Sequence, residues 1–314
     1  MHADLTAAVP AGVWGSWSPD PAVLLGLGLL GAAYGCGARR LWRGGRRAVS
    51  GRQAAAFAAG LAVVALALLS PLDGVAAALF AAHMAQHMLL IMVAAPLLVL
   101  GAPGLPLLVA LAPRWRRRLA RLRRRGDVAA GRRLLRHPAV AWGLHVGALW
   151  AWHLPVPFQA ALASPPVHAA EHASFLGTAV LFWWVVLSPR ARRPAAAPGG
   201  AVLYLFAAAL QGSALGALLT LAPAPLYPLQ AAAAASWGLA PLTDQQLAGL
   251  VMWIPADLVY LGTAGTLFMR WLLSLEAHDP RREQALRPAP VTPAGRFPAL
   301  RPAVGDGADQ EGGA

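Results

Sequence analysis

Two pairs of histidines are each spaced four residues apart, His83 with His87 and His168 with His172. In an α-helix, residues four apart lie on the same face, one turn above the other. Neutral imidazole binds copper, zinc and iron, and two histidines at this spacing can bind one ion from a single helix. The two pairs therefore predict a metal site, provided that both segments are helical and meet.

Methionines and further polar residues accompany these histidines. Met84 and Met88 repeat the four-residue spacing on the neighbouring helix face, and thioether sulfur favours monovalent copper. The candidate metal ligands are His83, His87, His153, His168 and His172, with Met84, Met88, Gln86, Glu171, Asp244 and Asp257 as supporting residues that orient ligands or carry protons. The alternative is that each histidine forms a hydrogen bond to a neighbouring helix and binds no ion.

The segments that carry these residues are apolar enough to cross a membrane. Of the 314 residues, 58% are hydrophobic and only 12% are charged, whereas soluble domains carry about 25% charged residues. Because a transmembrane helix needs about 20 mostly apolar residues, we predict an all-α fold, a polytopic membrane helical bundle of about seven transmembrane helices. The predicted spans are 21–38, 53–70, 75–100, 139–154, 167–187, 201–221 and 247–273.

Blocks of arginine alternate with these spans and predict the topology. The blocks lie at 39–52, 114–136 and 190–193, and the loops between the other spans contain no arginine or lysine. By the positive-inside rule the three arginine loops are cytoplasmic, which puts the N-terminus outside and the C-terminus in the cytoplasm. The five candidate histidine ligands then fall in the outer half of the membrane.

The topology divides the chain into three parts. We expect a short extracytoplasmic N-terminus at 1–20 and a seven-helix transmembrane domain at 21–276. The last part, 277–314, is rich in proline, glycine, alanine and charge, and this composition predicts a disordered cytoplasmic tail.

Composition also excludes several classes of function. The net charge of +13 is explained by the positive-inside rule, and no soluble stretch is large enough for a nucleic-acid recognition domain. The one cysteine, Cys36, allows neither an internal disulfide nor a CxxC pair, so a soft metal depends on histidine and methionine. Without a nucleophile motif or a phosphate-binding loop, we do not expect an enzyme.

Three stretches of the sequence resemble the CtaG family, which is linked to caa3-type cytochrome c oxidase. The first is HMAQHMLL at 83–90 with APLL at 95–98 and GAP at 101–103. The second is WHLP at 152–155, followed by His168, Glu171, His172 and Phe175. The third is DQQLAGL at 244–250 with WIP at 253–255. The resemblance implies a multi-pass protein of the bacterial plasma membrane that is needed to form active oxidase, with copper insertion as its suggested role and oxidase subunits as its partners.

Four functions remain open at this point. The first is an assembly factor that holds copper at the outer face and passes it to an oxidase subunit. The second is a haem b protein, although haem ligation favours one buried histidine on each of two facing helices over adjacent pairs. The third is a copper or proton transporter, for which only His145 extends the polar residues into the inner half. The fourth is a metal-free scaffold for oxidase subunits; the oligomeric state is left undetermined.

Overall fold

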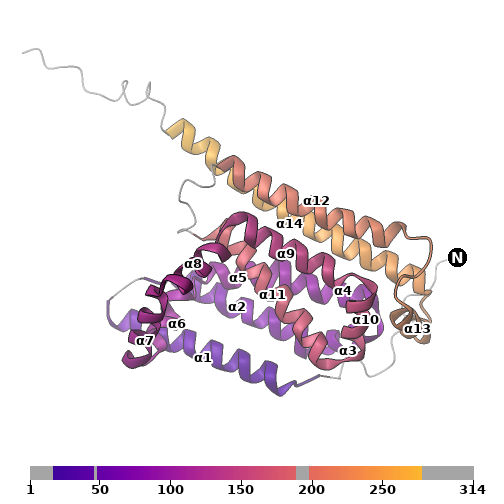
Figure 1. The fold of residues 1–314 in the computed structure, drawn as a ribbon, viewed down its shortest axis with the longest axis horizontal. Coiled ribbons are helices and arrows are strands. Elements are labelled where there is room, and N and C mark those ends of the chain that lie inside the picture. The colour runs from indigo at the N-terminus through magenta and orange to yellow at the C-terminus, as the bar shows by residue number, and fades with distance from the viewer. Residues whose placement is uncertain (1–16, 46–47, 189–197, 278–314) are drawn as a thin grey trace, which may run out of the picture. The chain divides into compact units, whose positions relative to one another are not determined.

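The structure is a computed structural model that describes residues 17–45, 48–188 and 198–277. All regular secondary structure in these residues is helical, as predicted (Figure 1). The chain divides into two compact units, Met1–Arg270 and Trp271–Ala314, and the packing described below belongs to the first. The helices in chain order are α1 Pro21–Arg43, α2 Gly51–Leu69, α3 Pro71–Ala78, α4 Phe80–Met88, the π-helix η2 Leu89–Ala94, α5 Ala95–Leu100, α6 Gly104–Ala110, α7 Pro113–Arg124, α8 Gly126–Leu135, α9 Pro138–Trp152, α10 Pro155–Ala163, α11 Pro165–Leu187, α12 Pro198–Leu221, α13 Pro228–Ser236 and α14 Pro241–Ala277.

Six segments of the described chain are long and apolar enough to cross a membrane. They match six of the seven predicted spans: Pro21–Arg43, Gly51–Leu69, Phe80–Leu100, Pro165–Leu187, Gly199–Leu221 and Pro241–Leu273. The chain is therefore a multi-pass membrane protein. The predicted N-terminal part, 1–20, falls mostly on residues 1–16, and the predicted tail, 277–314, falls almost entirely on residues 278–314. Both of these stretches lie outside the described residues.

The predicted fourth span, 139–154, corresponds to α9 and is not confirmed as a span. With 15 residues, α9 is about 22 Å long at about 1.5 Å per residue, which is shorter than the hydrocarbon core of about 30 Å. It still runs antiparallel to α11. Arg136, before α9, lies 5.7 Å from the ring of Trp184 near the end of α11, whereas Trp152 at the end of α9 donates to Ser174 Oγ (2.7 Å). The span count of seven and the orientation of the termini stay predictions.

The third span, which carries the first histidine pair, departs from the prediction at its start. Leu79 is extended, with φ −114° and ψ 128°, and it separates α3 from α4. The continuous span is therefore Phe80–Leu100 and not 75–100. This span is the most enclosed of the six, with 61% of its apolar window buried inside the protein, against 17–33% for the others.

The third span owes its burial to helices on several sides. η2 and α5 pack against α2 and against α11, and α11 also packs against α9. The largest core cluster joins α4, η2 and α5 to α9, α11, α12 and α14, and its fully buried side chains include Phe80, Met84, Ile91, Phe175 and Trp183. The two histidine pairs thus lie on the innermost helix and on one of its direct neighbours.

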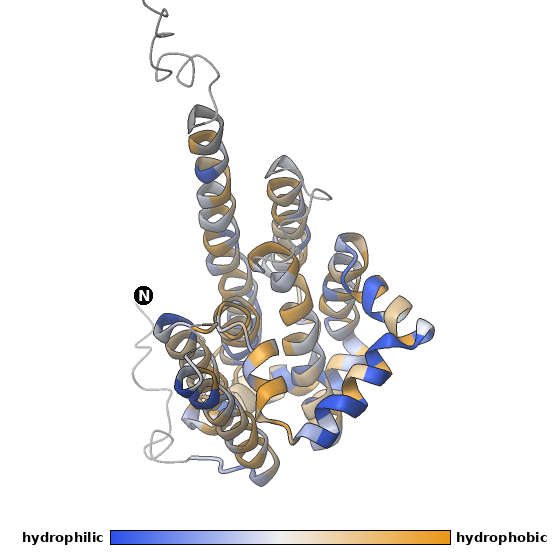
Figure 2. Cartoon of the chain, turned by 90° about the vertical axis from the view of Figure 1, so that its left-hand side faces the viewer, coloured by the Kyte–Doolittle hydropathy of each residue, from blue (hydrophilic) through white to orange (hydrophobic). Residues whose placement is uncertain are grey.

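Hydrophilic residues gather away from the long spans. In Figure 2 blue is densest on the short helices at the lower right, whereas the long helices are mainly orange to pale with separate blue turns. α7 and α8 carry the second arginine block and have no buried residue. At the C-terminal end of α1, Arg40 Nη1 donates to the carbonyls of Val109 (3.0 Å) and Ala110 (3.1 Å), which ties this end to α6.

Candidate metal centre

The start of α4 is fixed by a carboxylate from α14. Leu79 offers no side-chain cap, and the carboxylate of Asp244 instead accepts the backbone N–H groups of Phe80 (2.7 Å) and Ala81 (3.0 Å). A negative charge at a helix N-terminus satisfies free N–H groups and complements the helix dipole. Asp244 is 1% exposed, so these bonds are shielded from water. Asp244 thereby holds the helix that carries His83 and His87.

A π-helical segment follows directly after this histidine pair. In η2 the N–H groups bond to carbonyls five residues back, as Ala95 does to Leu90. The next residue, Pro96, has no N–H, so the carbonyl of Ile91 loses its partner within the helix. The indole N–H of Trp183 on α11 donates to that carbonyl (2.9 Å). This contact ties the third span to α11 about one turn beyond His87.

Four side chains from α4 and α11 point their donor atoms toward one another: His83, His87, Glu171 and His172. One ligand atom from each lies within 4.8 Å of all the others. Glu171 Oε2 is 3.7 Å from His83 Nε2, and Glu171 Oε1 is 3.9 Å from His87 Nε2. Four ligands at the corners of a tetrahedron, each about 2.1 Å from the ion, are about 3.4 Å from one another. Movements of about 1 Å would therefore bring these donor atoms within binding distance of one shared ion.

These four residues, which we call the donor cluster, are enclosed and unsatisfied. Their exposed fractions are 0%, 1%, 0% and 7% in chain order. Within the described residues, neither nitrogen of His83 or His87, neither oxygen of Glu171 and not Nε2 of His172 has a hydrogen-bond partner. Buried polar groups are almost always hydrogen-bonded, and an unpaired buried carboxylate is strongly unfavourable. A cation bound by three imidazoles and one carboxylate would satisfy these atoms, so the residues present fit a first-row metal ion such as copper or zinc.

A cavity of about 570 Å³ lies against the donor cluster, with α1, α2, α3, η2 and α11 as its walls. Most of its lining is apolar, and its polar lining consists of Asp20, Asp73, His168 and His172. The ring of His168 lies 4.2 Å from that of His172 and 5.4 Å from that of His83. His168, a predicted ligand outside the four-residue cluster, therefore lines the cavity beside the cluster, as His172 does.

Gln86 connects the cavity wall to the helix of the first histidine pair. Its Nε2 donates to Asp73 Oδ1 (2.9 Å) and to the carbonyl of Ala67 (2.7 Å). Gln86 lies one residue before His87, and these bonds run to α3 and α2. They fix the position of Asp73 in the wall and the rotation of α4 about its axis, which aims the histidines at α11.

His153 and Met84 form a separate pair. His153 Nε2 lies 3.3 Å from Met84 Sδ, and His153 Nδ1 lies 2.7 Å from the carbonyl of Leu149. Both side chains are buried, with 7% and 0% exposed. Tyr227 donates its hydroxyl to the carbonyl of His153 (2.7 Å), which holds the end of α9 in place. The predicted ligand His153 thus faces sulfur and is not one of the four donors.

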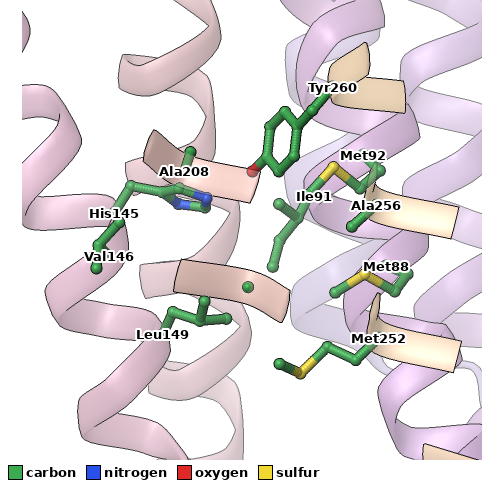
Figure 3. Close-up of a pocket in the computed structure, with 11 residues that line it drawn as sticks. Met88, Ile91, Met92, His145, Val146, Leu149, Ala208, Met252, Ala256 and Tyr260 are labelled. Atoms are coloured by element: carbon green, nitrogen blue, oxygen red, sulfur yellow. The ribbon is translucent and has the colours of Figure 1, made fainter. Parts of the chain in front are cut away.

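The other supporting residues lie elsewhere in the bundle. Met88 lines a small cavity of about 20 Å³ together with Met92, Met252 and His145, and Figure 3 shows His145 on one side with the three methionines opposite. Asp257 Oδ2 accepts the hydroxyl of Ser213 and the indole N–H of Trp253, both at 2.8 Å. The bond to Ser213 ties α12 to α14, and the bond to Trp253 lies within α14, so Asp257 holds two helices together outside the donor cluster.

The two histidine pairs lie together in the fold, and Glu171, predicted as a supporting residue, lies among them. Glu171 lies between His168 and His172 in the sequence, and the turn of α11 places it at the centre of the cluster, in contact with His83 and His87. A polar residue three or four positions from a histidine on a transmembrane helix was the available signal. No sequence pattern indicated a role for Asp73 or Met252, because their positions in the bundle depend on contacts between helices far apart in the sequence.

A bundle of apolar helices around a buried histidine–glutamate cluster defines a multi-pass membrane protein with a candidate metal centre. The family model of the cytochrome c oxidase caa3 assembly factor (Caa3_CtaG) matches residues 32–274, which is most of the chain. The chain therefore belongs to this family, as the three sequence stretches predicted. No curated protein and no solved structure shows a significant match to it.

Proposed function

We propose that this chain assists assembly of a caa3-type cytochrome c oxidase in the bacterial plasma membrane by binding a copper ion at His83, His87, Glu171 and His172 and passing it to an oxidase subunit. One observation carries the copper site: four buried donor side chains from two helices face one another and lack other partners. Family membership supports the assembly role, and the choice of copper over zinc rests on that role.

The residues of the donor cluster make different contributions to binding the ion. The three imidazoles supply nitrogen ligands, and the carboxylate of Glu171 supplies the negative charge that offsets a cation in a low-dielectric interior. Asp244 and Gln86 fix the end and the rotation of α4, and such outer contacts keep ligands in place while the ion is absent. Release requires only that α4 and α11 separate slightly, because the ligands divide between these two helices.

The large cavity supplies a route to the cluster. At one end it is lined by Asp20 at the start of α1, Asp73 in α3 and Pro165 at the start of α11, and this end of the bundle lies away from α7 and α8 (Figure 1). Two carboxylates there attract cations. His168 lies next along the route and faces His172 and His83, so an ion passes from carboxylate to imidazole ligands as it enters.

Metal content tests the site. We expect near-stoichiometric copper in the detergent-purified protein and the loss of one equivalent in His83→Ala/His87→Ala. His145→Ala is the matched control, because this buried histidine faces Thr178 and a separate cavity. A haem Soret band would replace the copper proposal with haem binding. Protein without metal or haem that still restores oxidase assembly in cells would leave a scaffold as the function.

The route has its own test in the rate of loading. Ala173 lines the cavity, and Ala173→Trp places a bulky ring in it without replacing a ligand. We expect copper loading to slow at least about tenfold while the final copper content is unchanged. Ala170→Trp, an exposed position on the same helix that does not line the cavity, serves as control. Equal loading rates in the two variants would exclude this route.

Haem binding agrees less well with the geometry. The four donor atoms lie within 4.8 Å of one another, and Glu171 lies between the imidazoles of α4 and α11. Haem iron bound by two histidines needs room for a porphyrin ring between them. A site in which a carboxylate occupies that space suits a single ion.

A further inference from the structure

The contact between His153 and Met84 joins two atoms that are both electron-pair donors. The Nδ1 of His153 lies 2.7 Å from the carbonyl oxygen of Leu149. A carbonyl oxygen only accepts hydrogen bonds, so Nδ1 carries the proton of the neutral ring. Nε2 is then unprotonated, and its lone pair faces the sulfur of Met84 at 3.3 Å. Neither atom can donate a hydrogen bond to the other.

A soft cation between the two atoms would accept both lone pairs and so explain their close contact. With metal–nitrogen and metal–sulfur bonds of about 2.0 and 2.3 Å, as first-row metals form in proteins, an ion can bind both atoms at an angle of about 100°. That angle leaves positions for a third ligand. A neutral thioether beside imidazole favours monovalent copper, because zinc takes sulfur mainly as thiolate and divalent copper prefers nitrogen and oxygen.

We propose that His153 Nε2 and Met84 Sδ form a second metal position, specific for Cu(I), beside the donor cluster. This inference rests on the proposed copper function and adds a second, softer position to it. Met84 follows His83 on α4 and points toward α9, whereas His83 points toward α11. One helix thus presents an imidazole to the cluster and a thioether to the second position.

The surroundings of the pair hold it in place for an ion. The bond to Leu149 fixes the ring of His153 and its tautomer, in the way that outer-shell bonds orient metal-binding histidines. The hydroxyl of Tyr227 holds the backbone of His153 (2.7 Å). Met84 is 0% exposed, so water cannot compete for its sulfur. The other described methionines of the core, Met88, Met92 and Met252, line the separate small cavity.

The test is an anaerobic Cu(I) titration against a chromophoric Cu(I) chelator, with X-ray absorption at the copper edge. We expect two Cu(I) per chain in the wild type and a sulfur scatterer at about 2.3 Å. Met84→Leu keeps the volume of the side chain and should lose one equivalent together with the sulfur signal. His153→Ala should lose the same equivalent. Met92→Leu, which removes a sulfur from the other cavity, should change neither stoichiometry nor spectrum.

The outcomes separate this inference from the proposed function. Copper bound only by nitrogen and oxygen in the wild type, or a sulfur signal that persists in Met84→Leu, overturns the second position and leaves the donor cluster standing. One sulfur-bound copper that is unaffected by His83→Ala/His87→Ala supports the second position and removes the cluster. No bound Cu(I) in the wild type overturns both.

Discussion

The cap that Asp244 places on α4 gives the most specific stability prediction. Asp244→Ala removes two hydrogen bonds, to the N–H groups of Phe80 and Ala81, and leaves a buried and a part-buried N–H group without a partner. Hydrogen bonds to charged groups contribute about 1.5–3 kcal/mol each, and the loss of a helix N-cap costs about 0.5–2 kcal/mol. Because one carboxylate makes both bonds, we expect a loss of about 3 kcal/mol for Asp244→Ala. Asp244→Asn keeps one acceptor oxygen and should lose about half as much.

The assay is reversible unfolding in mixed detergent micelles, followed by copper titration of the folded variant. Asp257→Ala is the matched control, because Asp257 is also an aspartate of α14 that accepts two hydrogen bonds. It should destabilise the bundle by a similar amount without weakening copper binding, since its partners lie outside α4. Asp244→Ala should reduce copper affinity at least about tenfold. Wild-type stability and wild-type copper affinity in Asp244→Ala would refute the role assigned to the cap.

Two further predictions concern helix packing. A Cβ added at Gly249 would lie 2.6 Å from the carbonyl oxygen of Gly216, so Gly249→Ala should destabilise the bundle by about 1–3 kcal/mol. Gly262→Ala has open space around its Cβ and should leave the stability unchanged or raise it by up to about 1 kcal/mol, because alanine has the higher helix propensity. Equal unfolding midpoints for the two variants would contradict this. Trp183→Phe leaves the carbonyl of Ile91 unpaired beside the π-helix and should cost about 1–3 kcal/mol in the same assay, and an unchanged midpoint would show that another group satisfies the carbonyl.

Periodicity and hydropathy were sufficient to predict the helices that carry the site. The spacing of His83 with His87 and of His168 with His172 put each pair on one helix face, and the packing of α11 on the third span brought them together. These features are local, because helix spacing and hydropathy are properties of contiguous sequence.

The departures from prediction arise from contacts between distant segments. The break at Leu79 is stabilised by Asp244, 164 residues beyond its partner Phe80, and no local pattern contains that partner. The π-helix depends on Pro96 together with a tryptophan 92 residues beyond Ile91. Met88 was grouped with the histidines by spacing, yet the turn of the helix directs it to a different cavity.

Glu171 illustrates how burial changes the role of a residue. In the sequence it was a supporting neighbour of two histidines. In the fold it has no exposed surface and lies 3.7 and 3.9 Å from histidine nitrogens on another helix. A buried carboxylate in this position needs a positive partner, and that requirement makes it the central residue of the site.

The most direct test of the account is the copper content of Glu171→Gln beside the wild type. This substitution keeps the shape of the side chain and removes its charge, so the bundle should fold normally. The account predicts near-stoichiometric copper at the donor cluster of the wild type and the loss of that equivalent in Glu171→Gln, with oxidase assembly reduced in cells. A folded Glu171→Gln protein that retains all of its copper would contradict the claim that these buried donors form the site.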